Sequence, residues 1–143
     1  MAIPESVEAV VTSGRLAHLV TLNRDGGPQV TCVWVGIEGD EIVVGHLSEH
    51  VKVRNVRRDA RVCLSMETDG VSPHGLSEYL VVYGTARITE GGAAELLQKL
   101  AYVYIGPGVK FPPMDNPPPG YVMRISPKRY SGVGPWTGTA TAG

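Results

Sequence analysis

Apolar and polar residues alternate over short stretches of the chain, which predicts a protein built mainly from β-strands. These stretches are separated by Gly, Asp and Pro, the residues that favour turns. The Asp25-Gly26 pair between two of them is typical of a hairpin, because both residues tolerate a positive φ. Six strands are predicted, at residues 16–22, 29–37, 41–45, 61–66, 79–88 and 121–125. We expect an antiparallel sheet that closes into a small barrel and so hides its edges.

Helices are predicted at residues 4–13 and 91–104, and a short helix is predicted within the run at 47–61, before the strand that begins at residue 61. A polar loop is expected at 67–78. The segment 106–120 holds six of the eleven prolines, and we expect it to lack regular structure. The small, polar tail at 137–143 is expected to be flexible. A single domain over residues 1–143 accommodates all of these elements.

Composition narrows the possible classes of protein. Hydrophobic residues make up 43% of the 143 residues, but only one is Phe, so we expect a valine-rich core of the kind that favours strands. The formal net charge of −1 argues against a general nucleic-acid binder. No apolar run approaches the roughly 20 residues of a membrane span, and no signal peptide is visible, so we expect a cytoplasmic protein without a membrane partner. Cys32 and Cys63 fall in strands and are expected to be buried free thiols, and no Cys/His spacing predicts a metal site.

The basic run at 47–61 stands out in this nearly neutral chain. It sets five cations against two acidic residues: Lys52, Arg54, Arg57, Arg58 and Arg61 against Glu49 and Asp59. Because a helix turns about 100° per residue, one face would carry Lys52, Asn55 and Arg58. The neighbouring face would pack on the core through Val53, Val56 and Ala60. The polar face could bind a phosphate group, and a solvated basic face without a ligand is the alternative.

Four motifs occur in a fixed order between residues 4 and 134. They are Asp25-Gly26-Gly27-Pro28-Gln29, Lys52-x-x-Asn55-x-x-Arg58-Asp59, Tyr83-Gly84-Thr85-Ala86 and Pro127-x-x-x-Ser131-Gly132. This order resembles the pyridoxamine 5′-phosphate oxidase-like split β-barrel family, and within it the actinobacterial flavin/deazaflavin oxidoreductases of the B class. The resemblance implies a mainly β (α+β) fold, a six-stranded antiparallel split barrel of the FMN-binding type flanked by short helices. It also implies a homodimer with a coenzyme groove between the subunits.

The resemblance assigns coenzyme-binding roles to eight residues. Lys52 and Asn55 would bind the coenzyme phosphate, with His50 and Arg58 as further candidates. His50 stands where close relatives often have Arg, so one phosphate contact would be missing or pH-dependent. The ring system of the coenzyme would lie along Thr31, Cys32, Val33 and Trp34, although a core position is the alternative for Trp34.

The chain shows no nucleophile-plus-base motif, so catalytic residues are not identified and the coenzyme would carry the chemistry. Tyr130, Trp136 and Met114 are candidates for a substrate pocket, with packing at a dimer interface as the alternative for Trp136. Five cations fit the strongly anionic coenzyme F-420, so F-420 is the predicted coenzyme. A protein of this family with F-420 would transfer hydride to or from a small unsaturated or aromatic substrate. FMN is the alternative coenzyme, and a non-catalytic cofactor- or haem-binding protein is a third reading.

Overall fold

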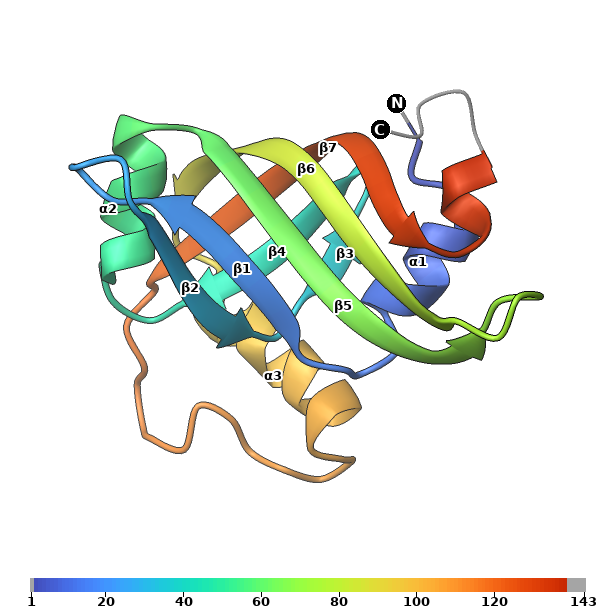
Figure 1. Ribbon diagram of the computed structural model, residues 1–143. Helices are drawn as coiled ribbons and strands as arrows, with labels where there is room; N and C mark the ends of the chain where they lie inside the picture. The colour runs from blue at the N-terminus through green and yellow to red at the C-terminus, as the bar shows by residue number, and fades with distance from the viewer. Residues whose placement is uncertain (1, 139–143) are drawn as a thin grey trace.

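The computed structural model describes residues 2–138, and Figure 1 shows strands wrapped into a barrel with helices around it. The helices are α1 (Glu5–Val11), α2 (Val51–Arg58), α3 (Ala93–Tyr104) and a 3₁₀ turn, η1 (Pro135–Gly138). The strands are β1 (Ala17–Leu22), β2 (Pro28–Val33), β3 (Gly36–Glu38), β4 (Glu41–His46), β5 (Arg61–Val71), β6 (Ser77–Glu90) and β7 (Tyr121–Val133).

The strands form one antiparallel sheet in the order β2-β1-β5-β6-β7-β4-β3. Its two outer strands are consecutive in the chain, because only Trp34 and Val35 separate β2 from β3. The sheet must therefore curl until its edges approach, yet no ladder joins β2 to β3 in the part of the chain that the structure describes. This confirms the predicted antiparallel split barrel, with seven strands instead of six and with an open seam instead of full closure.

The extra strand arises because the predicted strand at 29–37 is interrupted. Val35 donates its backbone N–H to the hydroxyl of Tyr104 on α3, over 3.1 Å. The same hydroxyl donates to the carbonyl oxygen of Arg15, over 2.9 Å. The Tyr104 side chain thus replaces a neighbouring strand as hydrogen-bond partner where the ladder stops. It joins α3 to the link between β2 and β3 and to the segment just before β1.

The polar loop predicted at 67–78 is wrong, because β5 and β6 continue through most of it. Glu67 pairs with Tyr79 and Val71 with Ser77, so the turn is confined to residues 72–76. Polar side chains here occupy outward positions of an antiparallel hairpin, where they are compatible with a strand. Gly75, with φ of +85°, occupies the turn itself.

The last strand is also longer than predicted, since β7 extends from Tyr121 to Val133 rather than ending at Ile125. Pro127 lies opposite Gly84 where the register between β6 and β7 shifts. Proline has no N–H for the ladder, and such a bulge tolerates it. A Cβ on Gly84 would collide with the carbonyl oxygen of Ser126, so glycine permits the close approach of the two strands.

Figure 1 shows α1 and α2 at opposite ends of the barrel. Val7 and Val11 of α1 and Val53 and Val56 of α2 are buried, which agrees with the amphipathic pattern of both segments. Ala60 was expected on the same apolar face, but it is exposed because α2 ends at Arg58. The α2 helix therefore presents a short buried stripe to the barrel end.

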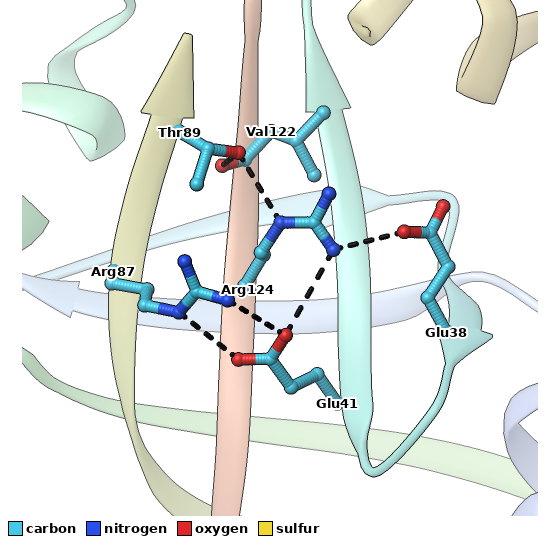
Figure 2. Close-up of polar contacts among 6 residues, drawn as sticks. All are labelled: Glu38, Glu41, Arg87, Thr89, Val122 and Arg124. Carbon is cyan, nitrogen blue, oxygen red and sulfur yellow. Dashed lines mark hydrogen bonds and ion pairs between the residues drawn. The ribbon is translucent and has the colours of Figure 1, made fainter.

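Beyond the core, an ion-pair network crosses the outer surface of four strands (Figure 2). Arg87 on β6 makes a two-pronged contact with Glu41, with bonds of 3.0 and 3.1 Å. Arg124 on β7 donates to Glu38 at 2.9 Å and lies 3.8 Å from Glu41. The network attaches the short edge strand β3 and its neighbour β4 to the centre of the sheet.

The expectation of two buried thiols is wrong for Cys32, which is exposed because it points outward from the edge strand β2. Cys63 is half-buried, and both cysteines are free. Of the tail predicted to be flexible, Thr137 and Gly138 belong to η1, and residues 139–143 lie outside the described residues. Between residues 2 and 138, none of the helices combines the length and apolar character needed to cross a membrane.

Candidate functional site

A cleft of about 260 Å³ lies where β2 and β4 end, beside the start of α2. The α3 helix and the Pro-rich segment form its other side. Its lining is apolar and aromatic on one side and basic on the other: Leu16, Cys32, Val33, Trp34, Val44, Gly45, His46, His50, Lys52, Leu97 and Phe111. Five residues predicted to contact a coenzyme thus meet in one cleft, namely Cys32, Val33, Trp34, His50 and Lys52.

Lys52 is the basic residue of the 47–61 run that lines this cleft. Its ammonium group donates to the hydroxyl of Thr31 over 3.2 Å, which brings a sixth predicted residue next to the cleft. No carboxylate among the described residues pairs with Lys52. Burial lowers the pKa of its ammonium group, because the charged form loses hydration. A half-buried cation without an acidic partner is a favourable contact for an anion that enters the cleft.

The other cations of the run are engaged within the protein. Arg54 donates to the backbone oxygen of Glu49 at 2.7 Å, and Arg57 pairs with the carboxylate of the same residue. Arg61 pairs with Asp59 at 2.7 Å, and the backbone N–H of Arg61 donates to the same carboxylate. These bonds lower the pKa of the Asp59 carboxyl to about 2. Among the described residues, two carboxylates and two backbone oxygens thus bind the four arginines of the run within the protein.

Asn55 and Arg58 are also placed differently from the prediction. Asn55 as a residue is only 3% exposed. Its amide nitrogen donates to Thr21 Oγ1 and Asn23 Oδ1, both at 3.0 Å. Its oxygen accepts a bond of 2.9 Å from Arg58, which also donates to the carbonyl of Leu22 at 2.7 Å. The network uses both N–H donors of the Asn55 amide, and it fastens α2 to the β1–β2 hairpin. Neither Asn55 nor Arg58 lines the cleft.

Two histidines enter the site from β4 and the start of α2. The rings of His46 and His50 are 5.8 Å apart and meet edge to face. His46 is buried, and burial together with the nearby Lys52 and His50 lowers its pKa to about 3, so the ring is neutral. His50 is largely exposed near Ser48, and burial, Lys52 and Arg54 lower its pKa from 6.5. Sequence reasoning missed His46, and its only signal was a histidine at a strand end immediately before the basic run.

An aromatic wall faces the basic side of the cleft. Trp34 stacks on Tyr104, with ring centroids 5.3 Å apart, and contacts Phe111 at 5.0 Å. Phe111 belongs to the Pro-rich segment at 106–120 and lines the cleft. Gln98 on α3 fixes this segment, since its amide donates to the carbonyl of Val109 at 2.7 Å and accepts from the N–H of Phe111 at 3.0 Å.

The three predicted substrate-pocket residues do not line the cleft. Trp136 is 2% exposed, packs in the barrel core and donates its indole N–H to Ser131 at 2.9 Å, so within the chain it offers no free face to a ligand. Tyr130 is partly buried against the same core. Met114 is exposed beside a separate hollow between α3 and the Pro-rich segment. Residues 2–138 contain no group of three or more His, Cys, Asp or Glu side chains arranged to bind a metal ion.

Three solved structures share the fold over most of the chain. An F420 reductase is 25% identical, with a TM-score of 0.71 over 90% of this chain and 98% of the other. The conserved hypothetical protein Rv2991 from Mycobacterium tuberculosis is 24% identical, with a TM-score of 0.68 over 92% and 88% of the two chains. HupZ from Group A Streptococcus is 19% identical, with a TM-score of 0.63 over 99% of both chains.

No curated protein matches the sequence. The family profile described as pyridoxamine 5′-phosphate oxidase matches residues 3–134, which is most of the chain and includes every residue that lines the cleft. Together with the split barrel and its strand order, this match shows that the chain belongs to the pyridoxamine 5′-phosphate oxidase family.

Proposed function

We propose that the protein is an oxidoreductase that binds the deazaflavin coenzyme F-420 in this cleft and transfers hydride to or from a small unsaturated or aromatic substrate. The observation that carries the proposal is the placement of Lys52, half-buried and without a carboxylate partner among the described residues, opposite the aromatic wall. Such a site fits a ligand with an anionic group at one end and a flat ring system at the other.

The residues present fit the parts of such a coenzyme. Lys52 and His50 lie at the N-terminal end of α2 and line the cleft, and they would bind the phosphate group. Backbone groups of Cys32, Val33 and Trp34 at the end of β2 would lie along the ring system. When bound, the deazaflavin supplies the hydride chemistry at its ring. The protein's part is to hold the ring, exclude water and leave one ring face open to substrate.

The choice of F-420 rests on the likeness to an F420 reductase at 25% identity. Charge no longer supports it, because Arg54, Arg57, Arg58 and Arg61 are engaged elsewhere. A single cation without a carboxylate partner among the described residues is enough for one terminal phosphate, and this favours FMN as the second candidate.

The size of the cleft supports a homodimer. Its 260 Å³ lies below the roughly 300–1,000 Å³ of most ligand sites, and a coenzyme of this class would extend beyond it. A second surface is then needed to cover the rest of the ligand. A second copy of the chain, bound beside the open seam of the barrel, would provide that surface.

Parallel titrations of the purified protein with F-420 and with FMN, followed by ligand fluorescence, test the coenzyme. We expect a dissociation constant in the micromolar range or below for F-420, and much weaker binding of FMN. The opposite order of affinity would identify a flavin protein. Failure of both ligands to bind would contradict the proposed function.

A further inference from the structure

His46 ends strand β4 and lies in the wall of the cleft next to His50 and Lys52. Its side chain is 4% exposed. The ring nitrogen Nε2 is buried and has no hydrogen-bond partner among residues 2–138. It is the one buried side-chain nitrogen or oxygen in that range left without a partner.

Such a group is unusual, because nearly all buried polar atoms in folded proteins are hydrogen-bonded. An apolar ring of similar shape at this position would avoid the free-energy cost of removing the nitrogen from water. His46 is a residue of the cleft wall, whereas the buried polar side chains of Thr21 and Asn55 have partners within the chain, since Asn55 donates to the Thr21 hydroxyl over 3.0 Å. A molecule that enters the cleft is therefore a natural source of the missing partner.

The surroundings of His46 determine which partner it accepts. The titratable groups that act on it are Lys52 and His50, and both disfavour a positive charge on its ring. A neutral imidazole has one N–H donor and one acceptor nitrogen. It can thus donate to an oxygen of an anionic ligand beside the Lys52 ammonium group, without adding a second buried cation.

We propose that His46 is a ligand-recognition residue of the cleft, whose neutral imidazole hydrogen-bonds an oxygen of the molecule that Lys52 binds through its anionic group. This inference rests on the proposed function, which supplies a phosphate-bearing redox coenzyme as the ligand. The inference adds a ligand contact from outside the basic run. It also explains why a polar ring occupies a position where its buried nitrogen has no hydrogen-bond partner among residues 2–138.

Two variants test the inference, with coenzyme affinity and thermal stability measured on each. His46→Phe keeps a flat ring of similar size and removes both nitrogens, whereas His46→Gln keeps a donor and an acceptor. For His46→Phe we expect the dissociation constant for F-420 to rise about tenfold or more, with the melting temperature of the free protein unchanged or higher. For His46→Gln we expect an intermediate affinity. His74→Phe, in the exposed β5–β6 turn, is the matched control and should bind as the original protein does.

Equal affinity of His46→Phe and the original protein for F-420 would overturn the inference while leaving the proposed function intact. Loss of both stability and binding in both variants would make His46 a packing residue and would also overturn it. If the original protein binds FMN and not F-420, the same comparison is made with FMN. If the original protein binds neither coenzyme, the proposed function fails, and the inference fails with it.

Discussion

Lys52 differs from the other cations of its run because it combines partial burial with the lack of a described acidic partner. On the proposed function, replacing Lys52 with alanine would remove a charged hydrogen bond to the ligand phosphate. We expect Lys52→Ala to weaken coenzyme binding by about 1.5–3 kcal/mol, as measured by titration. The control is Lys99→Ala, an exposed lysine on α3, which should leave affinity unchanged. Unchanged affinity in Lys52→Ala would instead indicate a basic residue without a ligand.

We expect His50 to make the affinity for the coenzyme depend on pH. Its pKa lies below 6.5 in the free protein, so the ring is mostly neutral at pH 7.5 and gains charge as the pH falls. Since an anion stabilises the charged ring, affinity for F-420, whose phosphodiester stays ionised, should rise as the pH falls below 6.5, by about three- to tenfold. Titrations at several pH values measure this rise, and His50→Gln should abolish it. A flat profile in the original protein would place His50 outside the site.

We expect His46 to make the free energy of unfolding depend on pH, and a fall in pH should lower it. Its pKa is about 3 in the folded protein and near 6.5 when the chain is unfolded, so the unfolded chain binds more protons between these values. The free energy of unfolding therefore falls as the pH drops from 6.5 towards 3. His46→Phe lacks this contribution, so denaturant unfolding should show its stability rising relative to the original protein as the pH falls. A constant difference between the two would show that His46 titrates normally.

Lys52 and Asn55 also show which features of a residue could be predicted from the sequence and which could not. Helical spacing correctly put both on the polar side of one short helix, but it does not reveal what that side meets. The β1–β2 hairpin folds over Asn55 and binds its amide, whereas Lys52, one turn earlier, remains at the cleft. His46 gave no periodic signal, because its burial depends on elements far away in the sequence.

The α2 helix is fastened at its polar face as well as at its apolar one. Asn55→Ala would leave Thr21, Asn23 and Arg58 without their shared partner, and we expect it to lower the free energy of unfolding by about 1–3 kcal/mol in urea titrations. Arg54→Ala on the exposed side of the helix should change stability by less than about 0.5 kcal/mol. If Asn55→Ala had normal stability but bound the coenzyme weakly, the result would support the original prediction that Asn55 binds the coenzyme phosphate.

Strand existence was predictable from alternation, but strand length was not. The breakers at Gly70 and Pro127 are tolerated, since one lies near an irregular end of β5 and the other at a bulge opposite Gly84. Conversely, the predicted strand at 29–37 is interrupted beside Gly36, and the N–H of Val35 is bonded there by the Tyr104 hydroxyl, a partner that the local sequence does not reveal. Element boundaries thus follow from tertiary hydrogen bonds that a local pattern does not contain.

The outer face of the sheet carries an uncharged row across four neighbouring strands. Val30, Val20, Cys63 and Tyr83 are register neighbours on β2, β1, β5 and β6. Val30 is 56% exposed and Tyr83 is 37% exposed. A sheet face that remains in water normally carries polar side chains at such positions, and an exposed apolar patch of this kind often marks an interface. We therefore expect this face to form the contact of the proposed homodimer.

A charge in this row should separate the subunits. We expect Val30→Glu to shift the protein from the mass of two chains to that of one in sedimentation velocity, because burying an unpaired carboxylate is unfavourable. Tyr102→Glu, at a 63% exposed aromatic residue on α3, is the matched control and should remain a dimer. The monomer should also bind F-420 more weakly, since the 260 Å³ cleft then lacks its second wall. A monomeric original protein with tight F-420 binding would show that one chain suffices, whereas a dimeric Val30→Glu would place the contact on another face.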